Sequence, residues 1–273
     1  MDLFPAWYDA IAVRASRRRY EPAAVADDIV ARLRAFCEAD RPSTSARVTM
    51  VEGASDRLFT GVLGKFAGSY GRVEGAPLVA AFVGSDGHEG EVGYLGEAFI
   101  LEATTLGLGT CWIAGTFDKK QAGELVELSE GERVMALTPL GTPVERRGAG
   151  KRLLRRALKV SRRLPLGTIA PGIDGPAGGK TAAATGSDTP WPAWARTAVE
   201  AARLAPSGVN RQPWRFRLEG PGLVLARAEK LYWTAPFDLG IAQLHVELGA
   251  AHAGVRGIWE PLVEPDVARF VPE

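Results

Sequence analysis

A turn between a helix and a strand constrains this chain more than any other stretch. Residues 203–218 read RLAPSGVNRQPWRFRL. The apolar spacing of residues 194–204 predicts a helix, and the alternation of apolar and polar side chains over residues 214–218 predicts a strand. The connection between them is either an ordinary turn with Trp214 in the core or a turn that exposes its backbone for binding.

The residues of this turn favour exposed backbone and short polar side chains. Pro206 fixes its own φ, and Gly208 allows a positive φ. Ser207 and Asn210 carry short side chains that bond nearby amides or a ligand. One hydroxyl, one amide and several free N–H groups can therefore meet at a single point.

A second unusual stretch lies near the N-terminus. Residues 14–20 read RASRRRY and place four arginines within six residues. A guanidinium binds a phosphate through paired, charge-assisted hydrogen bonds, each contributing roughly 1.5–3 kcal/mol. A bound dianion would explain the cluster, and a solvated basic surface is the alternative.

Composition excludes several classes of protein. The chain has 273 residues and is 46% hydrophobic, which is enough for a sizeable core. Its formal net charge of +1 gives no reason to expect a nucleic acid or an acidic membrane as partner. Cys37 and Cys111 form no disulfide framework, and no signal peptide or membrane span is evident. We therefore expect a soluble cytoplasmic protein.

Other segments have clear periodicity. We expect helices over residues 6–15, 27–39 and 91–107, and strands over residues 76–83, 110–114 and 133–143. Residues 146–163 are strongly basic and predict a solvated amphipathic helix, and residues 166–190 predict a linker or long loop.

The two unusual stretches together resemble one family. Residues 205–214, APSGVNRQPW, resemble the A-P-S-x-x-N-x-Q-P-W motif of FMN-dependent nitroreductases. Residues 14–20 are similar to that family's N-terminal R-R-S-x-R-x-[FY] segment. In the usual member a few tens of residues separate the two motifs, whereas here Ser16 and Ser207 are 207−16 = 191 positions apart.

The resemblance implies a set of FMN-binding residues. The arginine segment would bind the phosphate, and an arginine before a proline near the end of the catalytic core would also reach it. The backbone after the strand at 110–114 would donate N–H groups to the flavin, and the nearest basic residue before the strand at 76–83 would contact the pyrimidine end. These expected residues are Arg14, Ser16, Arg18, Arg72, Ala114, Gly115, Arg163, Pro206, Ser207, Gly208 and Asn210.

The two halves of the chain repeat each other. Residues 93–112 align without a gap on residues 240–259, at an offset of 240−93 = 147, and the match includes Gly107 with Gly254 and Trp112 with Trp259. A second alignment, at an offset of 206−42 = 164, places a Pro-Ser pair at 42–43 on the one at 206–207. Both alignments preserve the order of elements, which indicates duplication.

Duplication would explain the 191-residue separation. Nitroreductases are usually homodimers that share their flavin sites between subunits. The chain resembles a subgroup in which two half-copies form a pseudo-dimer within one chain, each half having kept a different part of the site.

We therefore expect an α+β fold, a nitroreductase-like three-layer sandwich with mostly antiparallel central sheets. The expected halves are residues 1–165 and 191–273, joined by the linker 166–190, in a monomer with one FMN bound across the pseudo-twofold axis.

The resemblance also implies the chemistry. We expect electrons to pass from NAD(P)H through FMN to a nitroaromatic, a quinone or a similar small acceptor. The flavin would carry the reaction, so we assign no catalytic side chain. The three histidines, His88, His245 and His252, have no metal-site spacing, and we assign no metal. The alternatives are a flavin-binding protein without turnover, for storage or sensing, and a structural pseudo-dimer without FMN.

Overall fold

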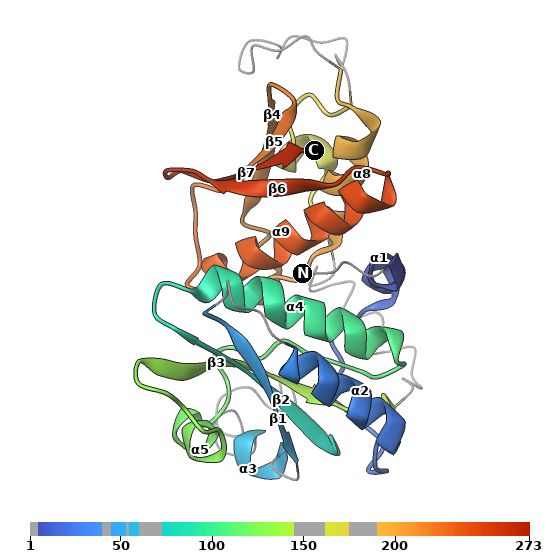
Figure 1. Ribbon diagram of the computed structural model, residues 1–273, viewed down its shortest axis with the longest axis vertical. Coiled ribbons are helices and arrows are strands. Elements are labelled where there is room, and N and C mark those ends of the chain that lie inside the picture. Colours follow the sequence, from blue (N-terminus) through green and yellow to red (C-terminus); the bar gives the residue numbers. More distant parts are fainter. Residues whose placement is uncertain (1–4, 40–44, 53–54, 60–72, 145–161, 175–189) are drawn as a thin grey trace. The chain divides into compact units, whose positions relative to one another are not determined.

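The computed structural model describes residues 5–39, 45–52, 55–59, 73–144, 162–174 and 190–273 (Figure 1). The chain forms two compact units, one of residues 12–147 and one of residues 2–11 together with 148–273. Most of the expected basic helix at 146–163 and most of the expected linker at 166–190 lie outside the described residues. Within the described part, none of the helices combines the length and apolar character needed to cross a bilayer.

The first unit is built on a three-stranded antiparallel sheet. Its strands lie in the order β1-β2-β3, and its helices cover both faces (Figure 1). The elements are β1 (Arg47–Glu52), β2 (Leu78–Ser85), β3 (Glu132–Leu140), α2 (Asp27–Glu38), α3 (Ser55–Phe59), α4 (Glu89–Thr105) and α5 (Lys119–Leu125).

The continuous apolar run of β2 explains its central place. Phe82 points to one side, where its ring meets Phe99 of α4 and Trp112. Val79 and Val83 point to the other side, into a cluster that includes Leu58 of α3 and residues around α5. Because successive side chains of a strand alternate between faces, a strand covered on both faces must be apolar throughout.

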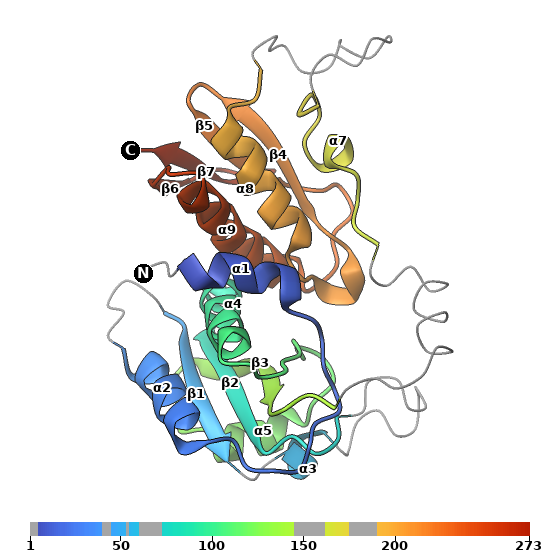
Figure 2. The ribbon, with the colours of Figure 1, turned by 90° about the vertical axis from the view of Figure 1, so that its right-hand side faces the viewer.

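The second unit has a four-stranded antiparallel sheet in the order β4-β5-β7-β6. Helices α8 and α9 pack against each other beside this sheet (Figure 2). The elements are α1 (Pro5–Val13, of which residues up to 11 belong to this unit), α7 (Leu166–Ile169), α8 (Ala193–Leu204), η1 (Gly208–Asn210), β4 (Trp214–Glu219), β5 (Gly222–Arg227), α9 (Ala235–His252), β6 (Gly257–Pro261) and β7 (Asp266–Pro272).

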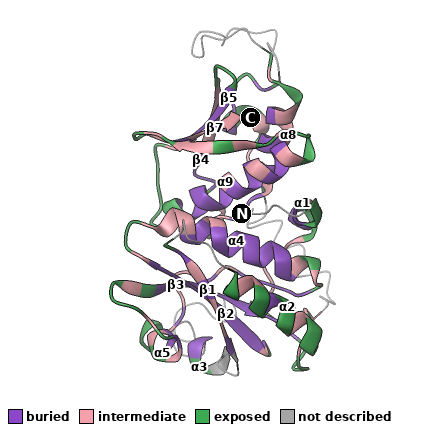
Figure 3. Cartoon of the chain, viewed as in Figure 1, coloured by how far each residue is buried: buried purple, intermediate pink, exposed green. Residues whose placement is uncertain are grey.

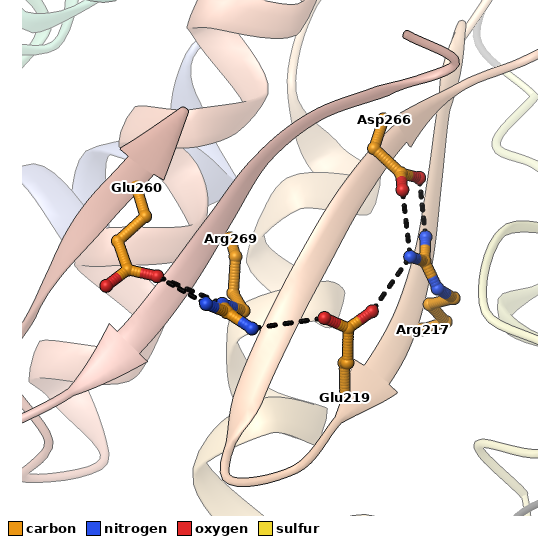
Figure 4. Close-up of polar contacts among 5 residues, drawn as sticks. All are labelled: Arg217, Glu219, Glu260, Asp266 and Arg269. Carbon is orange, nitrogen blue, oxygen red and sulfur yellow. Dashed lines mark hydrogen bonds and ion pairs between the residues drawn. The ribbon is translucent and has the colours of Figure 1, made fainter. Parts of the chain in front are cut away.

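One face of this second sheet carries a network of ion pairs (Figure 4). Arg217 of β4 forms two hydrogen bonds with Asp266, of 2.6 and 2.9 Å, and a third with Glu219. Arg269 of β7 binds Glu219 and also Glu260 of β6. The network crosses the strands, so charged cross-strand pairs cover this face of the sheet.

The two units repeat one arrangement. In each, a helix precedes the first strand, the first two strands pair antiparallel, a long helix follows the second strand, and that second strand has a register shift in its second half. Gly107 and Gly254 end the long helices with φ of +81° and +78°. Equivalent amides then donate back to the helix, from Leu108 to Ala103 and from Val255 to Ala250. Glycine at this position and this bonding pattern form a standard helix end.

The long helices α4 and α9 are buried over most of their length (Figure 3). Their apolar side chains surround the helix instead of forming a single stripe, which is typical of helices with no solvent-exposed face.

The expected α+β class with antiparallel sheets is confirmed, as are the helices near residues 27–39 and 91–107. The strand expected at 110–114 is wrong. Thr110 and Ile113 form only isolated bridges, to Ser16 and Leu137, so the segment is extended but irregular.

Gly249 generates a prediction about how α8 and α9 pack. A Cβ on Gly249 would lie 2.6 Å from the Cα of Ala198 and 2.8 Å from the carbonyl oxygen of Thr197, which are backbone atoms. Gly249→Ala should therefore force the helices apart and lower the free energy of unfolding by about 1–3 kcal/mol in urea denaturation. Gly123→Ala in α5 is the control, because its Cβ would meet only Leu128, at 3.7 Å. Equal loss in both variants would contradict this account.

Candidate functional site

The arginine segment is an extended strip held by backbone hydrogen bonds. The amide of Arg17 donates to the carbonyl of Thr110 at 2.7 Å, and the amide of Val144 donates to the carbonyl of Arg19 at 3.0 Å. Tyr20 and Glu74 are also joined, because the amide of Tyr20 donates to the carbonyl of Glu74. The strip is thus fixed against neighbouring extended segments of the first unit.

Arg14 is buried with incomplete hydrogen bonding. Its side chain is 7% exposed, and its Nε lies 3.7 Å from Oε1 of Glu97. Its Nε and Nη1 atoms have no hydrogen-bond partner among the described residues. Glu97 is fully buried on α4 and accepts a 2.6 Å hydrogen bond from the indole N–H of Trp112. Because unsatisfied buried N–H groups are costly, the geometry favours a further anionic partner for Arg14.

Three of the predicted residues gather around the thiol of Cys111. Burial raises the pKa of this thiol, while the guanidinium of Arg18, a hydrogen bond with Ser16 and the guanidinium of Arg14 act in the opposite direction. The structure therefore brings Arg14, Ser16 and Arg18 to one place.

The other predicted residues of the first unit differ in how they can be placed. Ala114 and Gly115 lie in a bend directly after the bridge between Ile113 and Leu137, and Gly115 is exposed. Arg72 lies outside the described residues.

The turn of the second unit has an unusual backbone. Val209, Asn210 and Gln212 have φ of 44°, 59° and 51°, a region that non-glycine residues rarely adopt. The amide of Gln212 donates to Oγ of Ser207 at 2.9 Å, and the amide of Asn210 donates to the carbonyl of Ser207 at 3.0 Å. Such a backbone persists only where surrounding contacts determine it.

Arg163 and Asn210 tie the turn to the segment before α7. Arg163 donates to the carbonyls of Leu204 and Ala205, at 2.6 and 2.8 Å, and to Oδ1 of Asn210 at 3.2 Å. The side-chain amide of Asn210 donates to the carbonyl of Arg162 at 2.9 Å. Arg163 therefore satisfies carbonyls at the end of α8.

Gln212 also ties the turn to the segment before α7, and it was not among the predicted residues. It is buried, its side-chain amide donates to the carbonyl of Arg162 at 3.1 Å, and its Oε1 accepts from the amide of Leu164 at 2.8 Å. The glutamine of the A-P-S-x-x-N-x-Q-P-W motif was the signal that could have identified it.

Asp238 holds the amide of Gly208 and was also missed. The amide donates to Oδ1 at 3.0 Å and to Oδ2 at 3.1 Å, and the hydroxyl of Thr234 donates to Oδ2 at 3.1 Å. Burial raises the pKa of this carboxyl to about 7, against the lowering effect of these two hydrogen bonds. A single aspartate in the first turn of a helix gave no sequence signal for this role.

An exposed aromatic pair lies beside the turn. Tyr232 is 39% exposed and Trp233 is 54% exposed, although both are large hydrophobic residues. The guanidinium of Arg211 lies 5.8 Å from the centre of the Tyr232 ring. The adjoining Thr234 contacts the turn closely, since a Cβ on Gly208 would lie 2.0 Å from its Oγ1. This loop therefore offers flat apolar surface next to residues 207–211.

An open hollow of about 550 Å³ is found elsewhere, near α3 and α5. It is lined by Arg57, Asp118, Lys120, Gln121 and Glu124 and contains none of the predicted residues. Its lining is charged and exposed, and it lacks the apolar walls of a typical ligand site.

Comparison with known proteins places these features in a family. The family described as "Putative TM nitroreductase" matches residues 6–250. The crystal structure of a nitroreductase, described as putative, from Thermotoga maritima MSB8 has a TM-score of 0.58 and 19% identity, covering 97% of this chain and 93% of that one. That likeness confirms the expected nitroreductase-like fold.

Other solved structures match about half of the chain. A nitroreductase family protein from Clostridium novyi NT covers 51% of this chain and 86% of its own, at 25% identity and a TM-score of 0.43. An FMN-dependent nitroreductase from Clostridium difficile R20291 covers 51% and 92%, at 16% identity and a TM-score of 0.43. No curated protein matches the sequence. Because the family match spans residues 6–250, the chain belongs to the "Putative TM nitroreductase" family, as the two sequence motifs predicted.

Proposed function

We propose that the protein is an FMN-dependent oxidoreductase that passes electrons from NAD(P)H through the flavin to a nitroaromatic, a quinone or a similar small acceptor. The observation that carries this proposal is the buried guanidinium of Arg14, whose Nε and Nη1 have no hydrogen-bond partner among the described residues. Solved structures described as FMN-dependent nitroreductase or as nitroreductase with bound FMN share the family name.

The residues present in the first unit fit a phosphate. Arg14, Ser16 and Arg18 all lower the pKa of the Cys111 thiol, and Ser16 pairs with Thr110 beside it, which supports their grouping in one region of the first unit. A phosphate there would accept hydrogen bonds from the guanidinium groups and from the serine hydroxyl. Glu97 offsets only part of the local positive charge, which leaves the site cationic.

Other residues would orient the flavin without entering the reaction. Ala114 and Gly115 would offer backbone N–H groups, and Arg72 would contact the pyrimidine end. In the second unit the turn that includes Pro206, Ser207, Gly208 and Asn210 would contribute its backbone and short side chains. The guanidinium of Arg163 donates to the carbonyls of Leu204 and Ala205 before this turn. Its expected contact with the phosphate stays a prediction.

When bound, FMN supplies hydride and electron transfer, so the protein needs no nucleophile of its own. The chain's residues would bind the phosphate, orient the ring and leave one face open to donor and acceptor. Tyr232 and Trp233 would give a planar acceptor an apolar surface, with Arg211 nearby for an anionic group.

We infer one flavin per chain, in a monomer that acts as an internal pseudo-dimer. The first half has Arg14, Ser16 and Arg18 but RPSTSAR at 41–47 in place of the full turn. The second half, residues 191–273, has the full turn but no segment like residues 14–20 before it. The strand order β1-β2-β3 corresponds to β4-β5-β7 of the second sheet, which has β6 in addition, and this partial match supports duplication. The proposed halves are residues 1–165 and 191–273, with the linker 166–190.

The function is tested by anaerobic reduction. We expect the purified protein, saturated with FMN, to hold about one flavin per chain and to lose its yellow colour when NADH or NADPH is added. Nitroaromatic or quinone should then restore the colour. Binding without reduction by either donor would favour storage or sensing, and no binding would leave a structural protein.

Arg14→Ala should weaken FMN binding. Loss of charge-assisted hydrogen bonds to the phosphate should reduce affinity roughly 10- to 100-fold in a fluorescence titration. Arg19→Ala is the matched control in the same segment, because Arg19 is exposed and pairs with Glu74 at 3.1 Å. Thermal unfolding of the apoprotein separates lost affinity from lost folding. Equal affinity of the Arg14→Ala and Arg19→Ala variants would remove Arg14 from the site.

Trp233→Ala should raise the KM for an aromatic acceptor by roughly 2- to 10-fold, since an aromatic contact contributes about 0.5–1.5 kcal/mol. Steady-state kinetics with the acceptor varied provide the measurement, and the reductive half-reaction should be unchanged. Ile258→Ala on β6 is the control, because Ile258 is similarly exposed. A KM for the Trp233→Ala variant equal to that of the control would exclude the aromatic loop from acceptor binding.

A further inference from the structure

A buried carboxylate anchors the turn of the second unit to α9. Asp238 lies in the first turn of α9 and is 3% exposed. Both of its oxygens lie within hydrogen-bond distance of the Gly208 amide, and one also accepts from Thr234. Among the described residues, no cation contributes to the shift of its pKa. A buried carboxylate without a charged partner is costly, so its contact with the turn calls for an explanation.

The turn requires such an anchor. Val209 and Asn210 follow Gly208 directly, and both have positive φ, as does Gln212. The Gly208 amide approaches α9 so closely that a Cβ there would lie 2.0 Å from Oγ1 of Thr234. The bond to Asp238 therefore fixes the turn at the residue where its unusual backbone begins.

An equivalent contact occurs in the first unit. Glu91 lies in the first turn of α4, and its Oε2 accepts a 2.6 Å hydrogen bond from the amide of Ser45. Glu91 and Asp238 are 238−91 = 147 positions apart, which is the offset that aligns the two long helices. Ser45 lies two positions after the Pro-Ser pair at 42–43, and Gly208 lies one position after the pair at 206–207. In both halves, an acidic residue in the first turn of the long helix thus accepts a hydrogen bond from a backbone amide shortly after a Pro-Ser pair.

We propose that Asp238 is a positioning residue that holds residues 206–212 in the shape that contacts the flavin. This inference rests on the proposed FMN site. The first unit's Glu91 is half-exposed and belongs to the half without the complete turn, so its contact has no part in binding.

The ionised carboxylate is the form suited to this role. With the pKa of Asp238 raised to about 7, the group is mostly ionised above neutral pH and mostly protonated below it. When protonated, one oxygen becomes a donor, and the neutral carboxyl accepts more weakly from Gly208 and Thr234 than the carboxylate does. Three ionisable groups of the surrounding elements have partners of their own: Arg163 binds the carbonyls of residues 204 and 205, Arg211 lies over Tyr232, and His245 bonds the carbonyl of Ala201. Arg203 in the last turn of α8 is the exception, because its buried Nε has no hydrogen-bond partner among the described residues.

The experiment compares FMN affinity between pH 6 and pH 8.5 in the wild type, Asp238→Asn and Glu91→Gln. The wild type should lose affinity roughly tenfold as the pH falls to 6. At that pH, one unit below a pKa of about 7, only about a tenth of the Asp238 carboxyl is ionised. Asp238→Asn should bind weakly at every pH and should lose the part of the pH dependence that Asp238 causes, since an amide cannot ionise. The change that remains near pH 6 then comes from the FMN phosphate, whose second pKa is about 6. Glu91→Gln should keep the profile of the wild type.

Unfolding of the apoproteins provides a readout independent of flavin. A carboxyl whose pKa is raised by folding binds its proton more tightly in the folded state, so its contribution to stability is lost as the pH rises through about 7. The wild type should therefore lose stability relative to Asp238→Asn between pH 6 and pH 8.5. FMN binding with the same pH profile in the wild type and in Asp238→Asn would overturn only this inference. Absence of FMN binding at every pH would overturn the proposed function and this inference with it.

Discussion

The buried carboxylate of Glu97 is the interaction on which the first unit's candidate site depends. It lies on α4 between the Arg14 guanidinium at 3.7 Å and the Trp112 indole N–H at 2.6 Å. Trp112 can reach it because the neighbouring Gly96 has no side chain, and a Cβ there would lie 2.5 Å from the indole ring. One charge on one helix thus fixes both the arginine strip and the segment that leads to Ala114 and Gly115. A buried arginine without this carboxylate would be strongly unfavourable.

The equivalent position in the second unit has changed in a consistent way. The offset of 147 places Leu244 where α4 has Glu97, and Leu244 is fully buried. Trp259 occupies the place of Trp112, and its indole N–H has no hydrogen-bond partner among the described residues. Where the arginine cluster is absent, its buried counter-ion is absent too. At the same offset, α9 has Gly249 where α4 has Glu102, and Glu102 pairs with Arg32 at 2.6 Å. Because Gly249 has no side chain, α9 can approach α8 directly.

The sequence predicted local features well and long-range contacts poorly. The helix ends at Gly107 and Gly254 and the turn at 206–210 were predictable, because the residues that determine them are adjacent in the chain. Asp238 is 30 positions from Gly208, and no periodicity connects the two. The strand expected at 110–114 failed for a similar reason: its apolar residues fit a strand, but whether a ladder forms depends on partners elsewhere. Arg163 was identified as important from its place before a proline, yet its hydrogen bonds to Leu204 and Ala205 come from the fold.

Under the proposed duplication, each half has a different part of the site to preserve. In a homodimer one sequence has to supply both the cationic strip and the constrained turn, so every protomer bears the cost of a buried ion pair and of a backbone with positive φ at non-glycine residues. Two linked copies can each bear only one of these two free-energy costs. The first unit has the buried Arg14 and Glu97, and the second has the turn with Val209, Asn210 and Gln212 at positive φ. On this proposal, Leu244 at the position equivalent to Glu97 is the less costly choice, because an apolar side chain fills a buried site at lower cost than a charge without a partner.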